Sequence, residues 1–179
     1  MEQKKNIILI GMPGSGKSTV GVLTAKALGL DFLDVDLLIQ QREGMLLQDI
    51  VDRRGVERFL DAEEAAVQSV QCAGTVIAPG GSAVCREGAA LHLKELGTVV
   101  YLYLPCDALQ DRLSNMATRG IAMEKGQTLQ DVYDYRAPIY EKYADLTVDA
   151  SGQTMEETVT AVLRALNAPE DICGRWPSL

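Results

Sequence analysis

Short apolar runs alternate along the chain with longer stretches in which apolar residues recur every three or four positions. The apolar runs are typical of strands buried on both faces of a sheet, and they cover residues 6–10, 32–35, 75–78, 99–104 and 146–148. The longer stretches have the spacing of amphipathic helices, and they cover residues 17–28, 60–72, 89–95, 107–115, 128–135 and 154–166. This alternation predicts an α/β fold with three layers, in which about five parallel strands lie between helices.

The ends of several expected helices carry residues with specific capping chemistry. Gly29 follows the first helical stretch and Gly74 follows the second, and glycine is common where a helix ends. Thr154 and Glu157 have the spacing of a capping box at the start of the last helix. Pro138 lacks an amide hydrogen, so we expect it to kink or restart the helix that precedes it.

Length and apolar content indicate one compact domain that spans residues 1–179. The chain has 179 residues, of which 47% are apolar and 23% are charged, so it can bury a core that offsets the entropy of ordering. Its longest apolar runs, such as 98–104, are much shorter than the roughly 20 residues of a membrane span. The apolar run at 7–10 is too short for a secretory signal. We therefore expect a cytoplasmic protein that does not bind membranes.

Charge and cysteine content exclude further classes of function. With 25 acidic and 17 basic residues the net charge is −8, which disfavours binding to nucleic acid, because such binding needs clustered cations. The cysteines form no CxxC pair and have no ligand-like spacing with His92, so we expect reduced thiols without a metal and assign His92 no role. These cysteines are Cys72, Cys85, Cys106 and Cys173.

Residues 11–18 read GMPGSGKS and match the phosphate-loop pattern GxxxxGK[ST]. The motif follows a predicted buried strand and begins a predicted helix, which is the context in which such a loop binds phosphate. Lys17 can reach the β- and γ-phosphates, and the Ser18 hydroxyl can coordinate Mg²⁺. The sequence therefore predicts a site for ATP with Mg²⁺. The residues assigned to ATP in and after the loop are Gly14, Ser15, Gly16, Lys17, Ser18 and Thr19.

Two aspartates, Asp34 and Asp36, mark the end of the second predicted strand. Alternation along a strand would put both carboxylates on one side, at the carboxyl edge where α/β sheets bind ligands. One carboxylate near the metal and one that accepts a hydroxyl proton are what phosphoryl transfer to an alcohol requires. We therefore predict that Asp34 lies near Mg²⁺ and that Asp36 binds the acceptor hydroxyl.

Two further features follow later strands. Gly80 and Gly81 come directly after the third apolar run, where glycines let a substrate approach the backbone closely, although a plain turn has the same pattern. Arg119 lies in a polar segment at 116–128 that contains glycines. Such a segment is typical of a flap that closes over phosphates and excludes water.

Together these motifs resemble the shikimate kinase family, which is related to the nucleoside monophosphate kinases. The resemblance covers nearly the whole chain and includes the phosphate loop, the two aspartates, the glycine pair, Arg119 and the segment RAPIY at 136–140. It implies a P-loop NTPase fold with a five-stranded parallel sheet, a small helical substrate-binding part at about 33–61 and a lid at about 112–124. It also implies Mg²⁺-dependent transfer of the ATP γ-phosphoryl group to a ring hydroxyl of shikimate.

The resemblance implies catalytic and metal-binding roles for individual residues. Lys17, Asp36 and Arg119 would be catalytic, because Lys17 holds phosphate, Asp36 grips the acceptor hydroxyl and Arg119 covers the phosphates. Ser18 would hold Mg²⁺, with Asp34 close to the metal.

The resemblance also implies how the two substrates are bound. Asp36, Gly80 and Gly81 would line the acceptor, and Arg136 would pair with the shikimate carboxylate. Arg112 matches a family position near the adenine of ATP. We expect a monomer that acts on a small molecule.

The chain departs from the family pattern at a second arginine that binds the carboxylate. Family members carry Gly-Glu-x-x-Phe-Arg-x-x-Glu, and when Phe59 and Glu63 are aligned the arginine position is Leu60. Arg58 would face the opposite side of a helix. Arg53 would share the face of Leu60 if one helix ran through both residues.

Two smaller departures are Ser82, in place of a third glycine, and Gly120, where a proline usually follows the lid arginine. Shikimate is the expected acceptor, but the missing arginine keeps other acceptors open, such as a cyclitol, a sugar or an amino-alcohol. A third alternative is a nucleotide-binding protein without acceptor activity. ATP turnover that is stimulated by a small acceptor would distinguish an enzyme from such a binder.

Overall fold

The structure, a computed structural model, describes residues 6–114, 121–169 and 172. Its centre is a five-stranded parallel sheet in the order β2-β3-β1-β4-β5. The strands are β1 (Asn6–Ile10), β2 (Asp31–Asp34), β3 (Thr75–Ala78), β4 (Gly97–Tyr103) and β5 (Leu146–Asp149). The predicted α/β fold with a five-stranded parallel sheet is therefore confirmed.

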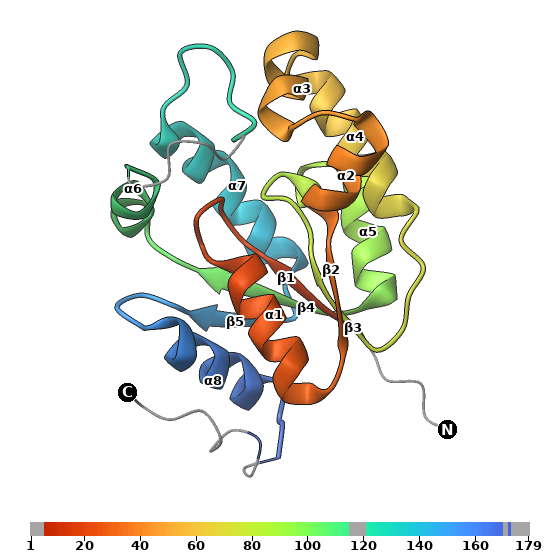
Figure 1. Ribbon diagram of the computed structural model, residues 1–179. Coiled ribbons are helices and arrows are strands. Elements are labelled where there is room, and N and C mark those ends of the chain that lie inside the picture. Colours follow the sequence, from red (N-terminus) through yellow and green to blue (C-terminus); the bar gives the residue numbers. More distant parts are fainter. Residues whose placement is uncertain (1–5, 115–120, 170–171, 173–179) are drawn as a thin grey trace.

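Helices cover both faces of this sheet, which gives the predicted three layers (Figure 1). One face is covered by α1 (Lys17–Leu28) and α8 (Met155–Ala165), and the other by α4 (Val56–Gln68), α5 (Glu87–Leu96) and α7 (Leu129–Tyr143). The remaining helical elements are α2 (Val35–Glu43), α3 (Leu47–Arg54), η1 (Ala83–Cys85) and α6 (Cys106–Ser114).

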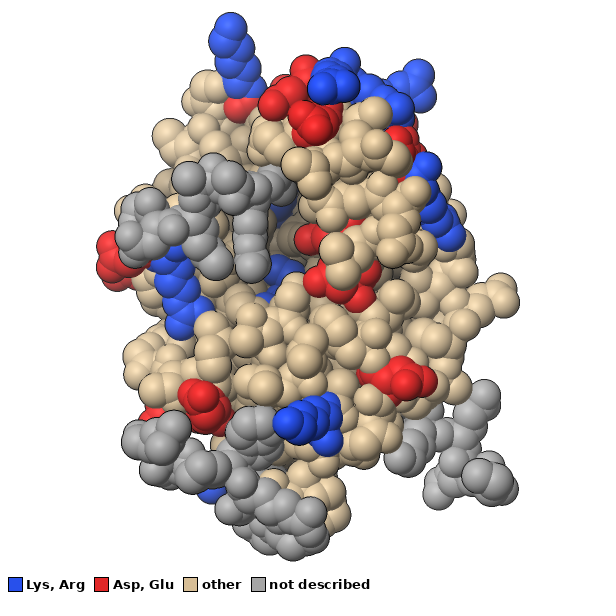
Figure 2. All heavy atoms as spheres, in the orientation of Figure 1, with Lys and Arg blue, Asp and Glu red and all other residues tan. Residues whose placement is uncertain are grey.

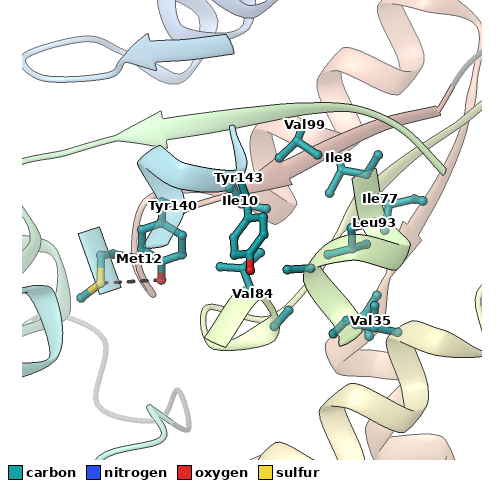
Figure 3. Packing of buried hydrophobic residues seen from close by; sticks show 14 of the residues in the cluster. Ile8, Ile10, Met12, Val35, Ile77, Val84, Leu93, Val99, Tyr140 and Tyr143 are labelled. Carbon is teal, nitrogen blue, oxygen red and sulfur yellow. Dashed lines mark hydrogen bonds between the residues drawn. The ribbon is translucent and has the colours of Figure 1, made fainter. Parts of the chain in front are cut away.

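Strand alternation sends the side chains of β1 into two separate cores. Ile7 and Leu9 pack in the cluster under α1 and α8, whereas Ile8 and Ile10 pack in the larger cluster on the opposite face. Figure 3 shows this larger cluster, in which Ile8 and Ile10 lie among side chains from β3, β4 and α7. Burial on both faces explains why the strands appear in the sequence as unbroken apolar runs.

The strand order brings three loops together at one edge of the sheet. β3 lies between β1 and β2, so the segments that follow these three strands are neighbours at their carboxyl ends. They are the phosphate loop after β1, the start of α2 after β2, and residues 79–82 after β3. In Figure 1, α2 and α3 extend beyond the sheet at this edge.

Gly55 separates two helices in the segment after β2. Its φ of 84° and ψ of 165° end α3 and begin α4 at Val56, four residues before the start expected from the sequence. A left-handed φ of this kind favours glycine. Arg53 and Leu60 consequently belong to different helices, and they do not share one helical face.

The expected restart at Pro138 is wrong, because α7 (Leu129–Tyr143) runs through it. A proline inside a helix removes a backbone hydrogen bond and costs about 3 kcal/mol. Buried side chains lie on both sides of it, with Arg136 before the proline and Tyr140 and Tyr143 after it. Tertiary packing of these side chains offsets the local cost.

Other sequence expectations are tested by local contacts. The capping box of Thr154 and Glu157 is confirmed at the start of α8. His92 has a structural contact, because its Nε2 lies 2.9 Å from the Val70 carbonyl oxygen. Within the described ranges, no group of three or more His, Cys, Asp and Glu residues is placed to hold a metal ion, and no helix is both long and apolar enough to cross a bilayer.

The cysteines agree with the expectation of reduced thiols as far as the structure describes them. Cys72, Cys85 and Cys106 are free, and Cys106 is buried. Cys173 lies outside the described residues, as does Arg119 of the predicted lid.

Candidate active site

The phosphate loop turns between β1 and α1 and holds the Lys17 side chain inside the molecule. Gly16 is the N-cap of α1 with a φ of 93°, a conformation that glycine adopts without strain. Lys17 is 8% exposed, and its Nζ donates to the carbonyl oxygens of Gly11 at 2.8 Å and Met12 at 2.9 Å. The loop carbonyls thus fix the ammonium group beside the helix N-terminus, where phosphate binds favourably.

Ser18 and Asp34 bring a hydroxyl and a carboxylate together. Ser18 Oγ donates to Asp34 Oδ2 at 2.8 Å, while Asp34 Oδ1 accepts from the backbone N–H of Asp36 at 2.9 Å. Mg²⁺ prefers oxygen ligands and keeps several waters, so it needs few ligands from the protein. These two side chains therefore fit a site for Mg²⁺ bound with a nucleotide.

The two aspartates are brought together by a helix cap and not by strand alternation, so that part of the prediction is wrong. β2 ends at Asp34, which is the N-cap of α2, and Asp36 lies in the first turn of that helix. An N-cap carboxylate accepts from a nearby backbone N–H, and this turn directs Asp36 toward the cavity.

Asp36 faces a second carboxylate, Glu63 of α4, across Gly80. A Cβ atom placed on Gly80 would overlap Glu63 Oε1 and lie 2.9 Å from Asp36 Oδ1. Glycine is therefore required at this position, because any side chain would displace one of the carboxylates. Both oxygens therefore pack against the backbone of Gly80, and Glu63 Oε1 occupies the position that a Cβ atom would take.

Glu63 has a strongly perturbed pKa. It is 1% exposed, and its Oε1 has no hydrogen-bond partner among the described residues. Burial raises the pKa of its carboxyl to about 7. A hydrogen bond from Ser82 lowers this pKa, and the negative charge of Asp36 raises it further. The positive charges of Arg136 and Lys17 also lower it. A carboxyl with such a pKa, in a cavity, is typical of a functional site.

Glu63 is a charged residue of this cavity to which the sequence predictions gave no role. In the family pattern, Glu63 fixes the alignment that puts Leu60 at the arginine position, and no chemistry was assigned to its carboxyl. Phe59 and Glu63 are four residues apart on α4 and both line the cavity. That spacing places them on one helix face. It is the feature of the sequence from which the position of Glu63 in the site could have been predicted.

Arg136 and Tyr140 connect α7 to the other parts of the site. Arg136 is 4% exposed and its Nη2 donates to the Ala122 carbonyl at 2.7 Å. One turn later, the Tyr140 hydroxyl donates to the Gly81 carbonyl and lies 3.8 Å from Met12 Sδ, as Figure 3 shows for the contact with Met12. The helix thus tethers both the glycine turn and the phosphate loop.

These elements enclose a cavity of about 320 Å³. Its charged lining, as far as the structure describes it, consists of Lys17, Asp34, Asp36, Glu63 and Arg136. In Figure 2, acidic and basic side chains gather around the hollow near the middle of the view. The volume suits a small polar molecule, and carboxylates outnumber cations among these side chains.

Other predicted site residues have different positions. Gly81 lines the cavity, whereas Gly80 lies behind the two carboxylates. Ser15 is buried, and Thr19 is exposed in the first turn of α1. Arg112 lies on α6, outside the cavity lining.

α6 reaches the phosphate loop through leucine side chains. A Cβ atom on Gly14 would lie 3.1 Å from Leu113 and 3.8 Å from Leu109. The helix that carries Arg112 is therefore next to the loop.

Comparison with known proteins agrees with this geometry. The family model described as shikimate kinase matches residues 13–167. The shikimate kinase of Thermodesulfovibrio yellowstonii is 35% identical over 163 residues, which cover 89% of this chain and 94% of that protein. The chain belongs to the shikimate kinase family.

The chain is also similar to a solved shikimate kinase structure and to part of a longer human protein. A shikimate kinase from Acinetobacter baumannii, solved in complex with shikimate, has a TM-score of 0.84 at 29% identity and covers 93% of this chain, with 94% of that chain covered. The human threonine synthase-like 1 is 35% identical over 171 residues, which are 94% of this chain but 23% of that protein. This chain thus also matches part of a longer protein.

Within this family, the arginine position at Leu60 is filled by no other described arginine. Leu60 is partly buried against the larger core. Arg58 and Arg53 are both exposed and lie beside surface carboxylates. Arg58 Nη1 is 4.0 Å from Asp61 Oδ2, and Arg53 Nη2 is 4.0 Å from Asp49 Oδ1. Neither arginine lines the cavity.

Proposed function

We propose that the protein transfers the γ-phosphoryl group of ATP to a hydroxyl of shikimate, as a shikimate kinase. The observation that carries this proposal is one cavity of about 320 Å³ that is lined by Lys17 of the phosphate loop together with Asp36 and Arg136. A cationic group for phosphate, a carboxylate for a hydroxyl and a guanidinium for a carboxylate are the three kinds of group that this reaction needs.

The nucleotide side binds and orients the phosphates. Lys17 and the N–H groups at the start of α1 would hold the β- and γ-phosphates, with Gly14, Ser15, Gly16 and Thr19 around them. Ser18 and Asp34 would hold Mg²⁺, which when bound neutralises charge on the phosphate oxygens. Arg112 would lie near the adenine.

The acceptor side binds the hydroxyl and orients it toward the γ-phosphate. Asp36 would accept the hydroxyl proton as the new O–P bond forms and ADP leaves. Arg136 would pair with the carboxylate of the acceptor. The turn at Gly80 and Gly81 would line the acceptor, with Gly80 leaving room for Glu63 and Asp36. Arg119 would cover the transferring group and exclude water.

The same proposal extends to the organisation of the chain. Residues 1–179 would form one kinase domain, with a substrate-binding part at about 33–61 and a lid at about 112–124. The protein would act as a cytoplasmic monomer on a small molecule, without nucleic acid or membrane.

The test is the release of ADP from Mg·ATP, measured with and without shikimate. We expect shikimate to stimulate ADP release strongly, and phosphate to appear on its ring. Lys17→Ala serves as the blank, and ATP binding by calorimetry shows that the protein is intact. ATP binding without stimulation by shikimate would contradict the proposal.

A further inference from the structure

Glu63 is a buried carboxylate that faces the acceptor cavity without a hydrogen-bond donor for one of its oxygens. The side chain is 1% exposed and lines the cavity, and Oε1 has no partner among the described residues. A buried polar atom without a partner costs free energy. A buried acceptor of this kind calls for a partner such as an ordered water or a ligand, and the Glu63 side chain lines the cavity.

The surroundings of Glu63 favour a hydroxyl as that donor. Asp36 Oδ1 lies against the same glycine as Glu63 Oε1, so a further anion beside these two carboxylates would be repelled. The nearby cations, Lys17 and Arg136, already donate to backbone carbonyls. A hydroxyl carries a proton for the carboxylate and adds no negative charge.

The recognition of an acceptor carboxylate is correspondingly limited. Arg136 is the guanidinium that lines the described part of the cavity, and one of its nitrogens is engaged by Ala122. The family arginine on α4 is replaced by Leu60, one turn before Glu63. The described lining therefore contains more groups that bind hydroxyls than groups that bind a carboxylate.

We propose that Asp36 and Glu63 together bind two hydroxyl groups of the acceptor, so that the enzyme also phosphorylates uncharged ring polyols. This inference rests on the proposed phosphoryl transfer at this cavity, and it names the acceptor class. Asp36 binds the hydroxyl that is phosphorylated, and Glu63 binds another hydroxyl of the same ring. The phosphoryl group passes from ATP to the first hydroxyl, whose proton goes to Asp36, and ADP leaves.

The experiment compares shikimate with its methyl ester, which has the same ring hydroxyls but no negative charge. We expect kcat/KM for the ester to lie within about tenfold of that for shikimate. An enzyme that depends on charge-assisted bonds to the carboxylate would lose roughly a hundredfold or more. A loss of that size would overturn the inference and leave shikimate kinase activity standing.

The two acceptors also separate this inference from the proposed function. Turnover with the ester but not with shikimate would support the inference and contradict shikimate as the acceptor. If neither acceptor stimulates ADP release from protein that binds ATP, both proposals fail.

Glu63→Gln tests the role of the residue itself. The amide has nearly the same shape but binds a hydroxyl without charge, so KM should rise about tenfold for both acceptors while kcat and the Kd for ATP change little. Glu64→Gln is the matched control, because Glu64 is the next residue on α4 and does not line the cavity. An unchanged KM for both acceptors in Glu63→Gln, with Glu64→Gln also unchanged, would overturn the inference.

Discussion

The nucleotide side and the acceptor side of the cavity are held together differently. On the nucleotide side Lys17 donates to two loop carbonyls and Ser18 donates to Asp34, while Ser15 Oγ is buried without a partner in the described structure. On the acceptor side Glu63 is buried beside Asp36, and one of its oxygens has no partner in the described structure. The ammonium of Lys17 and the Ser18–Asp34 pair on the first side are therefore preorganised by the protein, whereas on the second side the buried carboxyl of Glu63 keeps one oxygen without a described partner.

The two sides also differ in how far apart their residues lie in the sequence. Lys17, Ser18 and Asp34 come from two consecutive strand–helix connections. Asp36, Glu63, Gly81 and Arg136 come from α2, α4, the turn after β3 and α7. The nucleotide side is therefore specified by a local motif, and the acceptor side by the packing of four separate segments.

Lys17→Ala should have the largest effect, because it removes the cation of the preorganised side. We expect kcat with Mg·ATP and shikimate to fall roughly 10³-fold, since the ammonium stabilises charge on the transferring phosphoryl group. Steady-state ADP release measures this. Lys26→Ala, an exposed change on the same helix, should behave as wild type; full activity in Lys17→Ala would refute the assignment of the loop.

Asp36→Asn should affect the acceptor side without affecting the nucleotide side. Loss of the proton acceptor is expected to lower kcat by roughly 10²-fold, while the Kd for ATP stays the same. Asp31→Asn is the control, because Asp31 is exposed at the opposite end of β2. A change in ATP affinity alone would show that Asp36 belongs to the nucleotide side.

Glu63 should make stability fall as pH rises. Its pKa is raised from 4.5 to about 7 in the folded protein, so the folded state binds more protons than the unfolded state between these values. The contribution of this carboxyl to the free energy of unfolding is fully present below pH 4.5. It falls by about 3 kcal/mol as the pH rises to about 7.

Urea unfolding of wild type and Glu63→Gln at pH 5 and pH 8 isolates this contribution. The variant should gain stability relative to wild type by a few kcal/mol between the two pH values, because glutamine does not titrate. A difference between the proteins that does not depend on pH would mean that the carboxyl of Glu63 is not desolvated.

Leu60→Arg should bring the acceptor side closer to the family pattern. A guanidinium beside Phe59 and one turn before Glu63 would add a charge-assisted bond to the shikimate carboxylate. We expect KM for shikimate to fall about tenfold and KM for the methyl ester to stay constant. An equal change for both acceptors would argue against the alignment of Leu60 with the carboxylate-binding arginine.

Tyr140→Phe should have the smallest effect. It removes the hydroxyl that donates to the Gly81 carbonyl, which costs about 1 kcal/mol of stability. KM for shikimate should rise a few-fold and the Kd for ATP should be nearly constant, as kinetics and calorimetry can measure. A loss of ATP affinity larger than the rise in KM would indicate that Tyr140 acts mainly on the phosphate loop.

The layered fold could be predicted because strands that are buried on both faces leave apolar runs in the sequence. The path of α7 could not be predicted from local rules. Pro138 disfavours a continuous helix, and the burial of Arg136 and Tyr140 on either side of it overrides that preference. Such packing partners are distant in the sequence, so no local pattern reveals them.

The sequence by itself determined the nucleotide side, because the phosphate loop and Asp34 follow consecutive strands, and glycine, lysine and serine act there through nearby backbone. Tertiary structure alone decided that Glu63 faces Asp36 across Gly80 and that Arg53 and Arg58 point elsewhere. The physical reason is that the pKa and the missing partner of Glu63 depend on burial and on charges from α1, α2 and α7. Those surroundings exist after the chain has folded.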